Sequence, residues 1–183
     1  MRIEIKIPYS ETGQLADAYN LALTEGTSEW VLFLDHDVFL CCNPRWYHMC
    51  LQAVETLKKD PKAACIACIA GGEWHKKKKK NRTSVYNDRI QFHIENAKKA
   101  YQQYGNTLVR REKHVTGFFL LVNRKIASEI GFVQIRPGSI YNIDIDFGNR
   151  VLEAGYHNYT MPGLYVYHRR GMSHLKKEFI KND

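Results

Sequence analysis

The stretch Trp30-Val31-Leu32-Phe33-Leu34-Asp35-His36-Asp37 decides the fold. Its five apolar residues carry no charge and predict a strand over 30–34 that is buried on both faces, as in a parallel sheet. Two carboxylates follow where the strand leaves the core. Ligands of open α/β sheets bind outside the carboxyl ends of the strands. Asp35 and Asp37 therefore lie where a binding site is expected.

Strands and helices alternate on both sides of this stretch. Apolar alternation and short apolar runs predict further strands over 3–7, 63–70, 115–122 and 165–168. Helical spacing, with Pro and Gly at the ends, predicts helices over 14–24, 45–57, 89–104, 124–130 and 144–154. This order is typical of an α/β domain with a single, mainly parallel sheet flanked by helices. A chain of 183 residues is expected to form one domain, over 1–183.

The formal net charge of +8 favours polyanionic partners such as nucleic acid, anionic lipid or phosphorylated substrates. A loop over 71–88 carries a run of lysines with aromatic neighbours, which suits a nucleic acid. A solvated surface loop is an equally good interpretation of the run. Arg110 and Arg111 add charge close in sequence to a later motif, and we expect them on the acceptor side of a cleft. The lysines of the run are Lys76, Lys77, Lys78, Lys79 and Lys80.

Two features bear on location and on redox chemistry. No apolar run approaches the ~20 residues of a membrane span, and the first ten residues do not read as a secretory signal. We therefore expect a cytoplasmic protein, or one that meets a membrane only at its surface. Five cysteines make a disulfide framework unlikely in this chain. Cys65-x-x-Cys68 could indicate zinc, but residues three apart on a strand face opposite sides, so buried reduced thiols are the better interpretation.

Three groups of residues are candidates for chemistry. Asp35 and Asp37, at i and i+2 on an extended segment, point to one side and can hold Mg²⁺ or Mn²⁺ beside phosphate oxygens. A solvated turn is the alternative. Asp144 lies near a helix start, where the dipole favours an ionised carboxylate. It could act as a general base or simply cap the helix. Asp146 and Arg150, at i and i+4, could simply form a helix-surface pair. His168, at a strand end, could complete a metal shell or be a partly buried, hydrogen-bonded histidine.

Taken in order, these segments resemble the family 2 glycosyltransferases, which have a GT-A fold. The N-terminal half is shorter than in that family, and the family's uracil-contacting aspartate has no counterpart. The compact form is similar to small glycosyltransferases of phages. The matching segments are Ile7-Pro8-Tyr9, 13–20, 31–37, 116–124, Asp144-Ile145-Asp146 with Arg150 and Gly155, and Tyr167-His168.

The resemblance implies an enzyme that moves a sugar from a UDP- or GDP-sugar to an acceptor hydroxyl, using Mn²⁺ or Mg²⁺. It implies that Asp35 and Asp37 serve the metal and the ribose, that His168 is a third metal ligand, and that Asp144 is the base of an inverting reaction. The donor-binding residues would be Pro8, Tyr9, Ser10, Gly13, Asn20, Asp35 and His36. The acceptor and sugar cleft would include Thr116, Gly117, Asp146, Arg169 and Arg170.

The phage-like form suggests a hydroxylated base in DNA as the acceptor. A second hypothesis rests on the charge and the carboxylates alone: a basic nucleic-acid-binding protein, or a metal-dependent nuclease or nucleotidyltransferase. Release of a nucleoside diphosphate in the presence of Mn²⁺ supports the first hypothesis, and nicking of DNA supports the second.

Overall fold

Seven strands form one mixed sheet in this protein, described by a computed structural model over residues 2–71, 89–136 and 142–169. The strand order is β1-β2-β6-β4-β7-β3, and β5 also pairs with β7. In chain order the elements are β1 (Ile3–Lys6), α1 (Leu15–Thr24), β2 (Trp30–Leu34), β3 (Val38–Phe39), a 3₁₀ turn (Leu40–Cys42), α2 (Trp46–Leu57), β4 (Ala63–Ala70), α3 (Ile90–Tyr104), β5 (Val109–Arg111), β6 (Phe119–Asn123), α4 (Arg124–Ile130), α5 (Ile143–Glu153) and β7 (His157–His168).

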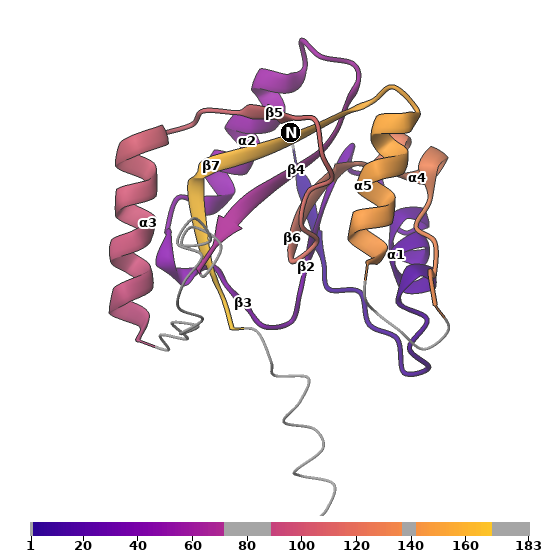
Figure 1. Cartoon of the computed structure of the whole chain (residues 1–183), viewed down its shortest axis with the longest axis horizontal. Coiled ribbons are helices and arrows are strands. Elements are labelled where there is room, and N and C mark those ends of the chain that lie inside the picture. The colour runs from indigo at the N-terminus through magenta and orange to yellow at the C-terminus, as the bar shows by residue number, and fades with distance from the viewer. Residues whose placement is uncertain (1, 72–88, 137–141, 170–183) are drawn as a thin grey trace, which may run out of the picture.

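Four strands run in one direction. β1 is parallel to β2 and β4 is parallel to β7, while β6 lies antiparallel between β2 and β4. The α/β class is therefore confirmed, with β1, β2, β4 and β7 pointing the same way. β6 and the short strands β3 and β5 run against them. The carboxyl ends of the four co-directional strands meet at one edge of the sheet, at the bottom of Figure 1.

Helices cover both faces of the sheet. The side chains of β2 alternate between two clusters: Leu32 and Leu34 pack with α2, whereas Val31 and Phe33 pack with α1, α4 and α5. Helix α3 lies at the β7 side of the sheet, where its Ala97 and Ala100 contact Tyr165 and Tyr167. The layers follow from the sequence, because a strand that is apolar at every position must be covered on both sides.

β7 is three times longer than predicted. It includes Pro162 and Gly163, which read as a loop in sequence because proline cannot donate to a ladder. The structure accommodates them in a bulge: Met161 pairs with Cys68 and Tyr165 with Ile69, so three residues of β7 have no partner in β4. A Cβ atom on Gly163 would lie 1.9 Å from the carbonyl oxygen of Gly105, so glycine lets the end of α3 approach the bulge.

Smaller differences from the predicted elements lie around β6. The strand begins at Phe119 and not at 115, and the short strands β3 and β5 were not predicted. Two or three residues give too short a pattern for periodicity to indicate a strand.

Arg124 ties three elements together on the far side of the sheet from the co-directional strand ends. Its guanidinium donates hydrogen bonds to three backbone carbonyls: those of Leu23, of Glu25 (3.0 Å) and of Ser28 (2.7 Å). These bonds provide donors for carbonyl groups at and after the end of α1. The guanidinium also forms a 2.5 Å ion pair with Glu4. Backbone N–H groups of Ser28 and Thr27 lower the pKa of Glu4 to about 2, so this carboxylate is ionised.

The cysteines are free thiols in the described structure. Cys65 and Cys68 belong to the clusters on opposite faces of the sheet, which confirms that they do not converge on a metal. The Cys65 thiol donates to the Asn158 side-chain oxygen at 2.6 Å, and burial raises the pKa of this thiol. No helix among the described residues has the length and apolar character needed to cross a membrane.

Candidate metal and catalytic site

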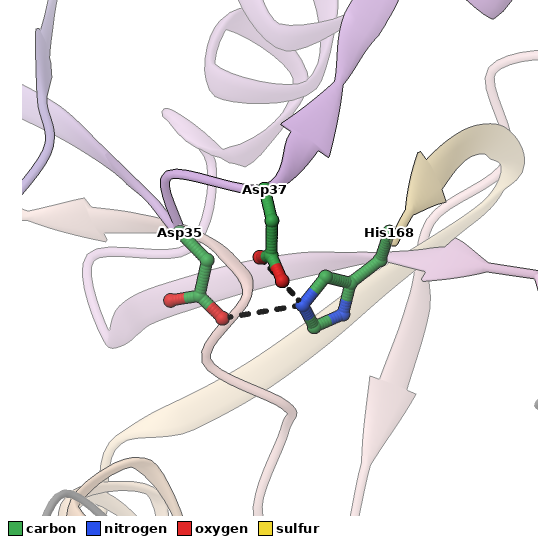
Figure 2. A group of neighbouring side chains, drawn as sticks. All are labelled: Asp35, Asp37 and His168. Atoms are coloured by element: carbon green, nitrogen blue, oxygen red, sulfur yellow. Dashed lines mark ion pairs between the residues drawn. The ribbon is translucent and has the colours of Figure 1, made fainter. Parts of the chain in front are cut away.

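Asp35, Asp37 and His168 converge at the carboxyl-end edge of the sheet. Their side chains offer one ligand atom each, all within 4.8 Å of one another. His168 Nε2 lies 3.0 Å from Asp37 Oδ1 and 3.5 Å from Asp35 Oδ2, between the two carboxylates in Figure 2. The exposed fractions of the Asp35, Asp37 and His168 side chains are 39%, 9% and 12%, so the cluster opens to solvent on the Asp35 side.

Backbone pairing brings the three residues together. Asp35 follows β2, and its N–H donates to the carbonyl of Phe118 at 3.0 Å, which extends the β2–β6 ladder by one residue. The chain then turns, and Val38 pairs with His168 across β3 and β7. The N–H of Arg169 donates to the Asp37 carbonyl at 3.0 Å. The histidine is therefore held opposite the acidic pair by strand pairing, although it lies 131 residues later than Asp37 in the sequence.

The electrostatics of the cluster suit a cation. Burial raises the pKa of Asp35; the imidazole of His168 opposes this, and the carboxylates of Asp37 and Asp144 raise it further. Three acidic groups thus repel one another at one place. Two carboxylates and an imidazole form a donor set that Mn²⁺ or Mg²⁺ accepts, with the imidazole favouring Mn²⁺. The residues present fit a divalent metal.

Asp144 lies in the first turn of α5, beside the cluster of Asp35, Asp37 and His168. Its Oδ2 accepts a 2.7 Å hydrogen bond from the N–H of Gly117. Its negative charge contributes to the raised pKa of Asp35. A Cβ atom on Gly117 would lie 2.6 Å from the Asp144 Cβ. Glycine is therefore required for this approach. Thr116, the neighbour of Gly117, is half-buried on the same segment.

Two predicted site residues make structural contacts elsewhere. Asn20 donates to the Phe132 carbonyl at 2.8 Å and accepts from the Phe132 N–H at 2.7 Å. Asp146 forms a 2.7 Å ion pair with Arg150, whose guanidinium donates to the carbonyls of Ile130 and Gly131 at the end of α4. These contacts lock the two side chains between elements. Roles for them in donor or acceptor binding stay predictions.

The remaining predicted donor residues lie on loops at the carboxyl-end edge. Pro8, Tyr9, Ser10 and Gly13 follow β1, and His36 is an exposed residue between the two acids. Contact of these residues with a donor stays a prediction. Lys76 to Lys80 and Arg170 lie outside the described residues, whereas the exposed side chain of Arg169 follows β7 directly.

The expected position of Arg110 and Arg111 is wrong. They lie on β5 and pair with Tyr159 and Asn158, near the start of β7. His168 is at the other end of that strand, so the two arginines are remote from the acidic cluster (Figure 1). The two arginines are close to Thr116 in sequence but not in space, because residues 112–118 run the length of the sheet before β6 begins.

Sequence reasoning gave no role to Phe118 or Tyr19. Phe118 stacks on the His168 ring with centroids 5.0 Å apart. Tyr19 is buried, and its hydroxyl has a raised pKa because of burial and of the nearby Asp35 and Asp144 carboxylates. Only the position of Phe118 directly after Thr116-Gly117 could have indicated that it contacts the site.

A layered α/β sheet with an acidic pair at the end of β2 is consistent with a protein of the GT-A type. The family model described as "Glycosyl transferase family 2" matches residues 3–131, more than half of the chain. The chain belongs to this family, and the family supports a glycosyltransferase activity. A search of curated proteins finds no match. The family match covers Asp35, Asp37 and Gly117 but ends before Asp144 and His168, so these two rest on the geometry described above.

Proposed function

We propose that this protein is a metal-dependent glycosyltransferase that uses a nucleoside diphosphate sugar. The convergence of Asp35, Asp37 and His168 at the carboxyl-end edge carries the proposal, together with membership of the family. A divalent cation held there would neutralise charge on the leaving diphosphate as a Lewis acid. The donor would be a UDP- or GDP-sugar.

The three residues of the cluster differ in burial, and we expect them to have different roles. Asp37 is nearly buried and held through its backbone by Arg169, so it is suited to fix a ligand in place. Asp35 is more exposed and faces the solvent side, where a donor would enter. His168, as a neutral imidazole, would offer Nε2 as the third ligand atom.

Asp144 would take the proton from the acceptor hydroxyl as that oxygen attacks the anomeric carbon. The Gly117 N–H holds one carboxylate oxygen, which leaves the other available for the acceptor. The bond from acceptor oxygen to sugar forms as the bond from sugar to diphosphate breaks, on the opposite face of the sugar. One base with no placed nucleophile is consistent with inversion.

A hydroxylated base in DNA stays a predicted acceptor. The observation behind it is the basic chain, with a net charge of +8. The lysine run that would contact the polyanion lies outside the described residues. Cationic contacts would make DNA binding fall with salt, so alanine replacement of residues 76–80 should weaken duplex binding and flatten its salt dependence. If the wild type does not bind duplex DNA at low salt, a nucleic-acid acceptor is excluded.

The test of the proposed function is release of a nucleoside diphosphate from a panel of UDP- and GDP-sugars with Mn²⁺. In parallel, UDP or GDP with Mn²⁺ should raise the melting temperature, because a ligand that binds only the native state stabilises it. Asp37→Asn should abolish both effects. The charge-matched control is Glu153→Gln, at the exposed end of α5, which should change neither. Nicking of DNA with Mn²⁺, without any diphosphate release, would refute the proposal in favour of a nuclease.

A further inference from the structure

Phe118 contacts the metal cluster from two sides. Its carbonyl oxygen accepts the N–H of Asp35 at 3.0 Å. Its ring stacks on the imidazole of His168, with centroids 5.0 Å apart and planes inclined by 29°. The residue is 4% exposed and therefore held by its own packing. Phe118 thus contacts two of the three residues of the cluster, Asp35 at the end of β2 and His168 at the end of β7.

The stacked ring restrains a side-chain freedom that strand pairing leaves to His168. Pairing of Val38 with His168 fixes the backbone of the histidine. It does not fix the last torsion of the side chain, which is broad and roughly two-fold for histidine. A flat, buried neighbour against the imidazole face limits this torsion. It keeps Nε2 directed at the two carboxylates, as Figure 2 shows for the ring orientation.

The segment also reaches the third element of the site. Gly117, the residue before Phe118, donates its N–H to Asp144. A shift of this dipeptide would therefore alter the acidic pair, the histidine and the carboxylate on α5 together. The arrangement places the segment where it can hold the separate parts of the site in one geometry.

We propose that Phe118 is a positioning residue that acts through His168 and Asp35 and sets the affinity of the site for its divalent cation. This inference rests on the proposed function, since it takes the three ligands as the metal site. Aromatic stacking of this kind changes an equilibrium constant by about two- to tenfold. Loss of the ring should weaken cation binding by that factor without removing any ligand atom.

The experiment is a Mn²⁺ titration of the full chain, followed by the electron paramagnetic resonance signal of free Mn²⁺. Phe118→Leu keeps an apolar side chain but loses the flat ring. The expected result is a dissociation constant for Mn²⁺ that is three- to tenfold larger than in the wild type. Phe118→Tyr keeps the ring and should bind within about twofold of the wild type. The matched control is Phe119→Leu, since Phe119 is a fully buried neighbour in the same core cluster and pairs with Leu34 of β2.

A second measurement does not need the metal. Long-range proton–nitrogen spectra report the imidazole nitrogens of the eight histidines. Phe118→Leu should move the His168 resonances, because the ring current disappears and the side chain gains freedom, while Phe119→Leu should leave them in place. This reading applies even to a variant of low stability, provided that it is folded at the temperature used.

The outcomes separate the two ideas. If Phe118→Leu and Phe119→Leu bind Mn²⁺ equally well, or equally poorly, Phe118 is only a core residue and the inference is overturned. In that case the proposed function still stands, provided that the wild type binds Mn²⁺ and Asp37→Asn does not. If the wild type and Asp37→Asn bind Mn²⁺ with the same affinity, the metal site itself is wrong and both proposals fail.

Discussion

Substitution of Gly117 by alanine should separate catalysis from metal binding. The added methyl would lie 2.6 Å from the Asp144 Cβ and 3.1 Å from its Cγ and Oδ2. Ordinary carbon contacts need about 3.5–4.0 Å, so α5 must move away from the segment by about 1 Å, since the hydrogen bond from Asp35 to the Phe118 carbonyl ties the segment to the end of β2. The atom that is met first is the Cβ, at the root of the side chain, and it cannot swing away as a long side-chain end would. The 2.7 Å hydrogen bond to Oδ2 is then lost or lengthened.

A displacement of about 1 Å at a reacting group costs about 100-fold in rate, and overpacking of this kind costs about 1–3 kcal/mol in stability. We therefore expect Gly117→Ala to lower the rate of diphosphate release about 100-fold while Mn²⁺ affinity changes little. The control is Gly148→Ala, which overpacks the same helix against His114 at 2.9 Å without touching Asp144. Turnover above a third of wild type in Gly117→Ala, or an equal loss in both variants, would refute the reasoning.

Other predictions test single groups. Asp144→Asn should lower turnover by about 100-fold or more and keep nucleotide binding with Mn²⁺ in a thermal-shift assay; equal loss of both would make it a binding residue. Asp60 accepts hydrogen bonds from His157 and Tyr159 at 2.7 and 2.6 Å. Burial raises the pKa of Asp60, but these bonds outweigh it and lower the pKa below its usual value. This carboxylate therefore stabilises the fold above the unfolded pKa of about 3.9 and loses that contribution as the pH falls through its lower folded value. Melting curves of Asp60→Asn should differ from wild type at pH 7 and converge with it in acid. Arg124→Lys should lower the free energy of unfolding by about 3 kcal/mol in urea, because an ammonium cannot serve Glu4 and the α1 carbonyls together; an unchanged midpoint would contradict this.

The elements that carry strong periodicity were predictable from the sequence. β2 over 30–34 and β4 over 63–70 agree residue for residue with the prediction, and α3 and α4 agree to within one residue. The position of the acidic pair at the end of β2 followed from one apolar run and the direction of the chain. These features depend on local pattern, which a sequence contains in full.

Contacts between distant segments could not be read in the same way. The side chain of Asn20 bonds to Phe132, 112 residues away, and Arg150 donates to the Ile130 and Gly131 carbonyls at the end of α4. Both are polar residues in a family-like motif, and nothing local distinguishes a residue that binds a ligand from one that binds backbone. The length of β7 was missed for another reason: Pro162 and Gly163 carry the signals of a loop, and the approach of Gly105, which explains Gly163, is visible only in the structure.

The bulge in β7 also determines how the strand can change during evolution. Side chains along a strand alternate between faces, so a shift of one residue turns every later side chain to the opposite side. His168 lies four positions after Leu164, the last bulged residue. A one-residue deletion within 162–164 must be absorbed by the bulge itself, or Arg169 takes the position of His168 and the imidazole turns to the α3 side, where Tyr167 now packs. Insertions or deletions should accordingly be tolerated in surface loops of this protein and selected against in these three residues, although they are not among the proposed metal ligands.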